Sequence, residues 1–123
     1  MATVELTKDN FEETVTGSEI VLIDFWAAWC GPCRRFGPIY EKAAERHPDI
    51  VFGKIDTEAQ PELAEAFQIT SIPTLMAVRE RTVLYSQPGA LPPQALEELI
   101  GGIRTVDMQD VRRRQASDSA IAN

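Results

Sequence analysis

The chain has 123 residues, of which 44% are hydrophobic and 25% are charged, a composition typical of a soluble globular protein with one domain. Its net charge of −7 leaves no basic surface to neutralise phosphates, so nucleic acid is excluded as a main partner. The longest apolar stretch, residues 20–30, is interrupted by Asp24 and is too short to span a bilayer, which excludes a membrane protein.

The N-terminal residues predict the compartment. Residues 1–6 have neither a basic start nor an apolar core, so they are not a signal peptide. We therefore expect a cytoplasmic protein with no membrane partner. In that reducing compartment a pair of cysteines is more often catalytic or metal-binding than a structural disulfide.

The first half of the chain predicts two strands and two helices. The residues that follow position 20 are nearly all apolar and rich in β-branched and aromatic side chains, which is typical of a central strand buried on both faces. Thr7 is expected to cap the first helix, and Pro38 is expected to kink the second. The predicted elements are a strand over 3–7, a helix over 8–15, a strand over 20–28 and a helix over 33–47.

The second half predicts three more strands, the last two of them joined as a hairpin. The hairpin turn, residues 79–81, lacks the Asn-Gly or Asp-Gly pair that a tight two-residue loop usually needs, so we expect a longer or strained turn. The predicted elements are a strand over 50–55, a short helix over 59–67, strands over 74–78 and 82–86, and a last helix that follows Pro93 and reaches Ile103.

This order of elements indicates an α/β layer fold with a parallel centre and an antiparallel edge. After Ile103 the apolar pattern thins. We therefore divide the chain into a domain over 1–106 and a C-terminal extension over 107–123, which we expect to be flexible. The charge follows a similar division, because residues 1–103 carry 8 basic and 16 acidic side chains, whereas residues 104–123 carry 4 and 3.

The chain has only two cysteines, Cys30 and Cys33. A structural disulfide with so short a loop would contribute about 1.9 kcal/mol, against about 3 kcal/mol for a loop of about 15 residues. A closed zinc site needs about four ligands. His47, the one histidine, would lie roughly 21 Å from Cys33 along a helix and is expected to be exposed or to cap that helix. A metal shared between two chains and a catalytic pair are the alternatives that stay open; we expect no metal.

The position of Cys30 favours a reaction centre. Cys30 lies where a strand gives way to a helix, so its sulfur faces unpaired backbone N–H groups and the positive end of the helix dipole, which both favour the thiolate. Gly31 and Pro32 stiffen the turn that brings Cys33 back towards Cys30. A thiolate there could attack a substrate disulfide, and Cys33 could then resolve the mixed disulfide intramolecularly.

Several segments resemble the thioredoxin family. Trp29-Cys30-Gly31-Pro32-Cys33 matches the hallmark of that family in full, and Ile72-Pro73-Thr74 matches its cis-proline loop. Lys54-Ile55-Asp56 and Gly89-Ala90-Leu91 match further family segments, and the resemblance covers about residues 3–103 in the right order. It implies a thioredoxin fold, a central mixed sheet of about five strands flanked by about four helices.

The resemblance also implies roles for individual residues. Cys30 would be the nucleophile and Cys33 the resolving thiol, with Gly31 and Pro32 completing the catalytic turn. Client proteins would dock on an apolar rim, where the backbone at Ile72 can pair with an extended client segment. The rim residues are Trp29, Ile72, Pro73, Gly89 and Ala90.

Asp24 is a single carboxylate within a strand of core residues, and burial raises the pKa of a carboxyl group towards neutrality. One interpretation is a satisfied structural carboxylate paired with Lys54 of the neighbouring strand. The resemblance suggests instead a general base that takes the proton from Cys33 through a water. We favour the second interpretation and expect Lys54 to belong to the same catalytic site.

The predicted function is that of a thiol–disulfide oxidoreductase that reduces disulfides in client proteins and maintains cellular redox homeostasis. The resemblance implies an NADPH-dependent thioredoxin reductase as the recycling partner, and no Gly-rich dinucleotide motif is present, so we expect no bound cofactor. We expect a monomer. One alternative is an oxidant or isomerase, although Gly31-Pro32 offers no histidine to stabilise the reduced form. The other is a non-enzymatic docking module, whose function would survive replacement of both cysteines.

Overall fold

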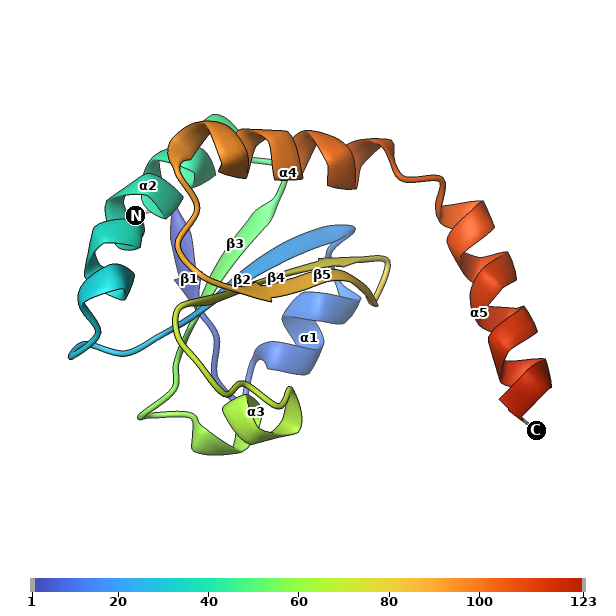
Figure 1. Ribbon diagram of the computed structural model, residues 1–123, viewed down its shortest axis with the longest axis horizontal. Coiled ribbons are helices and arrows are strands. Elements are labelled where there is room, and N and C mark those ends of the chain that lie inside the picture. The colour runs from blue at the N-terminus through green and yellow to red at the C-terminus, as the bar shows by residue number, and fades with distance from the viewer. Residues whose placement is uncertain (1, 123) are drawn as a thin grey trace.

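The computed structural model describes residues 2–122 and contains a central five-stranded sheet with helices on both faces (Figure 1). Helices α2 and α4 lie over one face, and α1 and α3 lie over the other. The predicted α/β layer architecture is therefore confirmed. In chain order the elements are β1 (Thr3–Glu5), α1 (Phe11–Thr16), β2 (Ile20–Trp26), α2 (Gly31–Arg46), β3 (Val51–Asp56), α3 (Pro61–Ala66), β4 (Thr74–Arg79), β5 (Thr82–Pro88), α4 (Pro93–Thr105) and α5 (Met108–Ala122).

The sheet has the strand order β1-β3-β2-β4-β5. Strands β1, β3 and β2 are parallel, whereas β4 and β5 add an antiparallel edge, as predicted. The apolar run becomes the central strand β2, which is buried except for the half-buried Trp26. Successive side chains of a strand point to opposite faces. The even-numbered residues of β2 pack with α2 and α4, the odd-numbered ones with α1 and α3, so Asp24 faces α2 and α4.

The first helix begins later than predicted, because its N-cap is Asn10 and not Thr7. Residues 7–10 form a turn in which the backbone N–H groups of Asn10 and Phe11 donate to the carbonyl of Thr7. The Asn10 side chain accepts the N–H of Thr7 at 2.7 Å. An asparagine side chain offers the backbone this alternative to a helical turn, which a search for capping residues alone does not detect.

The hairpin turn between β4 and β5 is tight. Arg79 pairs with Thr82, so the turn consists of Glu80 and Arg81 alone. Both residues have left-handed backbones, with φ of 51° and 64°, a conformation that usually requires Asn or Gly and costs about 1–2 kcal/mol per residue for other types. Of the two predicted outcomes, a longer turn is wrong and a strained turn is confirmed.

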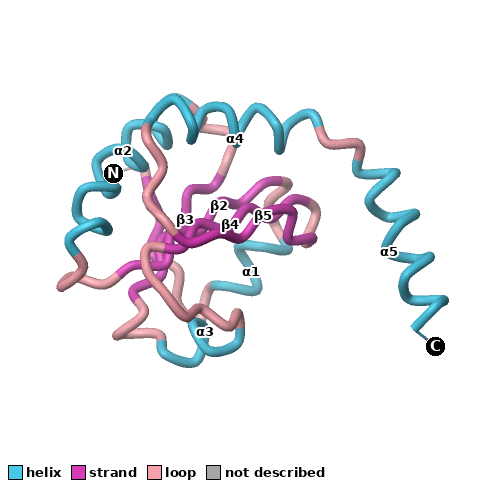
Figure 2. Tube along the Cα trace, viewed as in Figure 1, coloured by secondary structure: helices cyan, strands magenta, loops and turns pink. Residues whose placement is uncertain are grey.

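The C-terminal extension is not irregular. Helix α5, which we did not predict, covers Met108–Ala122 and extends away from the sheet (Figures 1 and 2). The flexibility of this extension stays a prediction. Its start is attached to the domain, because Met108 is buried. The domain division between residues 106 and 107 stays a prediction. Neither α5 nor any other helix in the described part of the chain is long and apolar enough to cross a membrane.

Candidate active site

The cysteine pair lies at the start of α2, shortly after the end of β2. Cys30 is the N-cap of the helix, and Gly31 and Pro32 occupy its first turn, where the missing N–H of a proline leaves no hydrogen bond unmade. Cys30 and Cys33 are joined by a disulfide, with their Cα atoms 5.2 Å apart. Each cysteine is only 4% exposed. The predicted pair is therefore formed, and the sulfurs are bonded to each other.

The environment of the Cys30 sulfur is electropositive. The backbone N–H of Cys33 donates to Sγ of Cys30 at 3.2 Å. The sulfur also lies at the N-terminal end of a helix of 16 residues, where the helix dipole favours negative charge. In the reduced protein both interactions stabilise a thiolate at Cys30.

Two of the predicted rim loops lie beside the pair. The Ile72–Pro73 peptide bond is cis, and Ile72 packs against the two cysteines with its carbonyl oxygen 3.7 Å from Sγ of Cys30. The backbone N–H of Gly89 donates to the carbonyl of Pro73 at 2.8 Å, which brings the loop of Gly89 and Ala90 to the same edge. Gly89 has a φ of 113°, a backbone that residues with a Cβ rarely adopt.

Trp29 is the most exposed aromatic residue at the site, with 66% of its surface accessible. Its indole N–H donates to the carboxylate of Glu58 at 2.7 Å, which holds an otherwise free ring. Trp29 and Ile72 line a cavity of about 320 Å³ together with Ile69 and Ala64. Glu58 did not emerge from the sequence, because nothing in its local pattern indicates a contact with a residue 29 positions earlier.

Asp24 is buried without a partner. It is 1% exposed, and neither of its carboxylate oxygens has a hydrogen-bond partner in the described part of the protein. Burial raises the pKa of Asp24 from 3.8 to about 7, an effect that the nearby charge of Lys54 partly opposes. The pKa of Tyr40 on α2 is also raised, mainly by burial and to a smaller extent by the negative charge of Asp24.

Lys54 does not form the ion pair with Asp24 that the less favoured, structural interpretation of this carboxylate required. It is the neighbour of Asp24 in the register of β2 and β3, yet no salt bridge within 4 Å joins the two residues among those described here. Its ammonium group lies over the ring of Trp26 instead, 4.9 Å from the ring centroid. The negative face of an aromatic ring attracts a cation, so this position is favourable at a half-buried site. Lys54 and Trp26 line a cavity of about 510 Å³.

His47 lies at the opposite end of α2, as its capping position predicted. Its Nε2 is 2.7 Å from the carboxylate of Glu97, and its Nδ1 is 3.0 Å from the guanidinium of Arg104. Because Arg104 can only donate, Nδ1 must accept and the proton sits on Nε2. His47 therefore ties α2 to α4 and takes no part in the cysteine site.

The arrangement supports one chemistry in particular. Two cysteines that can exist as a dithiol or as a disulfide, at a helix N-terminus and beside an open apolar rim, define a thiol–disulfide oxidoreductase.

Comparisons with known proteins identify the family. The profile of the thioredoxin family matches residues 2–101. The putative thioredoxin 2 of Streptomyces coelicolor is 64% identical over 121 residues, which cover 98% of this chain and 90% of that protein. The thioredoxin of Alicyclobacillus acidocaldarius is 39% identical over 103 residues, which cover 83% and 98%.

Solved structures agree with this result. A thioredoxin of Plasmodium falciparum is 33% identical with a TM-score of 0.76, over 81% of this chain and 98% of that one. A thioredoxin variant from Halobacterium salinarum is 28% identical with a TM-score of 0.78, over 85% and 93%. The chain belongs to the thioredoxin family. It is a protein-disulfide reductase that works by dithiol–disulfide exchange through Cys30 and Cys33.

Proposed function

We propose that Cys30 is the attacking thiolate and Cys33 the resolving thiol. The Cys30 thiolate attacks one sulfur of a client disulfide, forms a mixed disulfide and releases the other client sulfur, which takes up a proton. Cys33 then loses its proton and attacks Sγ of Cys30, so that the Cys30–Cys33 bond forms and the second client thiolate leaves. A pair of electrons passes from the dithiol to the client. The observation that carries this assignment is the hydrogen bond from Cys33 N–H to Sγ of Cys30.

Asp24 has the properties of the base for the second step. A carboxyl with a pKa of about 7 changes protonation at the pH of the cytoplasm, which is what proton transfer to and from a thiol requires. The buried oxygens of Asp24 have no hydrogen-bond partner among residues 2–117, so a water could link them to Cys33. Lys54 tunes this group by charge. Replacing Asp24 with Asn should slow product release, and a rate equal to the wild type across about pH 6–9 would exclude the role.

The rim of Trp29, Ile72, Pro73, Gly89 and Ala90 is the proposed client-docking surface. The carbonyl of Ile72 lies beside the reactive sulfur, and an extended client segment could pair with this backbone as an added strand. The exposed indole of Trp29 and the cavity next to it would receive an apolar client side chain.

The remaining parts of the proposed function concern the cell. An NADPH-dependent thioredoxin reductase would return the Cys30–Cys33 disulfide to the dithiol, and the protein would act as a monomer in the cytoplasm to maintain redox homeostasis. The family membership and the exposed rim around the cysteines support this proposal, because a second redox protein needs access to the same sulfur.

The first experiment is to trap the intermediate. Cys33→Ser should accumulate a mixed disulfide between Cys30 and a client protein, whereas Cys30→Ser should form none and lose reductase activity by at least about 10³-fold. Accumulation with the opposite variant would reverse the assignment. A client bound equally well by the variant that lacks both cysteines would indicate a docking module.

The second experiment is the reduction potential of the Cys30–Cys33 couple, followed by tryptophan fluorescence in dithiol buffers. A potential near about −270 mV, the known value for thioredoxin, would support the reductase. A potential between about −180 and −120 mV would indicate an isomerase or an oxidant instead. Turnover of NADPH by a purified thioredoxin reductase with this protein as the substrate tests the recycling partner.

A further inference from the structure

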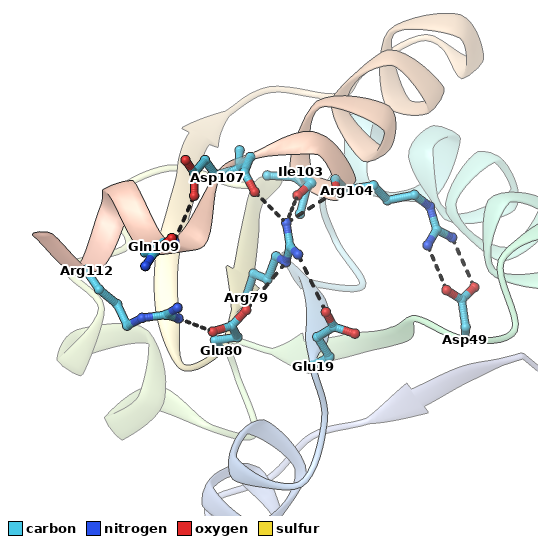
Figure 3. Close-up of polar contacts among 10 residues, drawn as sticks. Glu19, Asp49, Arg79, Glu80, Ile103, Arg104, Asp107, Gln109 and Arg112 are labelled. Atoms are coloured by element: carbon cyan, nitrogen blue, oxygen red, sulfur yellow. Dashed lines mark hydrogen bonds and ion pairs between the residues drawn. The ribbon is translucent and has the colours of Figure 1, made fainter.

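Arg79 at the end of β4 holds the junction between α4 and α5 (Figure 3). Its Nη1 donates to the carbonyls of Ile103, Arg104 and Val106 at 2.9, 3.3 and 3.0 Å. The last carbonyls of a helix have no partner within the helix, so the guanidinium supplies the donors that α4 lacks. The Arg79 side chain is 15% exposed and its Nη2 lies 3.6 Å from Glu19. The junction is therefore fixed to the sheet by a mostly buried clamp.

Glu80, the next residue, makes a second contact with the extension. Its carboxylate accepts a hydrogen bond from Arg112, in the second turn of α5 (Figure 3). Met108 is a helical turn before Arg112 and therefore on the same side of α5. Met108, Arg112 and Glu80 line one cavity of about 770 Å³, and Met108 is 5% exposed. One side of α5 thus faces the β4–β5 turn.

The same turn has an unfavourable backbone. Glu80 and Arg81 both have positive φ, where Asn and Gly are the usual residues of a two-residue hairpin turn. Asn-Gly would suit the hairpin better, but it would remove the carboxylate that binds Arg112. The hydrogen bond between the Glu80 carboxylate and Arg112 thus explains why a glutamate occupies a position with an unfavourable backbone conformation.

We propose that Arg79 and Glu80 form a docking site for the chain's own C-terminal helix, and that the β4–β5 turn carries Glu80 for this contact although its backbone is strained. The docked helix lies outside the residues that the thioredoxin family profile matches, 2–101. The match to the Streptomyces coelicolor protein covers 98% of this chain and therefore includes most of α5. The extension is an added arm of the domain.

The two contacts respond differently to the solvent. Arg112 and Glu80 are 57% and 38% exposed, so salt weakens their attraction. The Arg79 side chain is mostly buried and its hydrogen bonds go to uncharged backbone carbonyls, so salt weakens these hydrogen bonds little. The outer contact opens first, while residues 103–107 stay fixed. In Figure 1 α5 lies at the far end of the molecule from the start of α2, so its movement leaves the cysteines free.

The test uses the full chain and the backbone order parameters of residues 108–117 measured by NMR relaxation. In the wild type these residues should move with the domain, with order parameters near about 0.85. Replacing Glu80-Arg81 by Asn-Gly should lower them below about 0.6 while raising the Tm by about 5 °C, because the turn becomes relaxed. Arg112→Gln should lower the order parameters as well, without raising the Tm.

Arg113→Gln is the matched control, because Arg113 pairs with Asp110 inside α5 and has no ion pair with the domain in the described part of the chain. It should leave the order parameters unchanged, and about 1 M salt should reproduce the effect of Arg112→Gln. Equal order parameters in the Asn-Gly variant and the wild type would overturn the proposal. So would a Tm that falls in that variant, or an Arg113→Gln effect as large as that of Arg112→Gln.

Discussion

Asp24 and Arg79 are two charged residues withdrawn from water on adjacent strands, and their surroundings differ. Asp24 is 1% exposed and its carboxylate has no hydrogen-bond partner among the described residues. The guanidinium of Arg79 donates through Nη1 to three backbone carbonyls, although its buried Nε lacks a hydrogen-bond partner among the described residues. A buried charge with partners is stable in one protonation state, whereas a buried charge without partners is easily neutralised. Asp24 is therefore suited to proton transfer, whereas Arg79 is suited to stabilising the fold.

The largest expected effect is that of Asp24→Asn on stability. The pKa of Asp24 is raised from 3.8 to about 7 in the folded protein, so the folded state binds the proton more tightly than the unfolded state. Stability consequently falls as pH rises from about 4 to about 7 and stays low above that range. The variant lacks this loss, so it should be more stable by on the order of 4 kcal/mol above about pH 8.

This prediction is checked by denaturant unfolding of the oxidised protein at several pH values. The stability difference between Asp24→Asn and the wild type should nearly vanish at about pH 4 and grow with pH. The exposed Asp9 supplies a control, because Asp9→Asn should change stability by no more than about 0.5 kcal/mol. Parallel curves for the wild type and Asp24→Asn would contradict an unpartnered, buried carboxylate.

Arg79→Met should act in the opposite direction and without the pH dependence. Methionine keeps most of the apolar stem but leaves the carbonyls of Ile103, Arg104 and Val106 without their donor. We expect a loss of about 2–3 kcal/mol, the range for hydrogen bonds to a charged group, that is constant between about pH 5 and 9. The same unfolding series measures it. A pH-dependent loss would show that Arg79 interacts mainly with titrating carboxylates such as Glu19.

The sequence predicts Asp24 but not Arg79, for a physical reason. A carboxylate inside a run of β-branched and aromatic residues is visible without any knowledge of the fold, because its burial follows from its neighbours in the chain. An arginine at a strand end is ordinary, and its role depends on residues 24 to 27 positions later. The cysteine pair was predictable for the same reason as Asp24, since both cysteines lie within one local turn. The loop of Ile72, 42 positions after Cys30, was expected at the site only from the family resemblance.

Helix α5 was missed because the prediction relied on an apolar stripe. Its residues include arginine, glutamine and alanine, which have high intrinsic helix propensity, and Asp110 forms ion pairs with Arg113 and Arg114 along the helix. A helix that is polar on nearly all sides has no hydrophobic pattern to detect. The alternative interpretation, in which Asp24 pairs with Lys54, does not hold for a different reason: strand register makes the two residues neighbours, but Lys54 lies on the Trp26 ring.

Trp29→Ala should affect the cysteine end of the molecule alone. The ring is 66% exposed, so its removal should change the free energy of unfolding by less than about 0.5 kcal/mol. As a proposed client anchor it should raise KM for a protein disulfide roughly fivefold, or about 1 kcal/mol, with kcat little changed. Val83, also exposed but on β5, is the control: Val83→Ala should leave KM unchanged. Equal KM values for both variants would remove Trp29 from the docking surface.

The smallest predicted effect concerns Lys54, whose charge lowers the pKa of Asp24. Lys54 lowers the pKa of Asp24 against the larger effect of burial, so Lys54→Met should move the midpoint of the pH–stability curve to higher pH. The exposed Lys42 on α2 provides the control, since Lys42→Met changes the net charge equally without a position beside Asp24. If both variants move the midpoint alike, Lys54 acts only through the net charge. Its position over Trp26 would then be a packing contact, and Asp24 would be governed by burial alone.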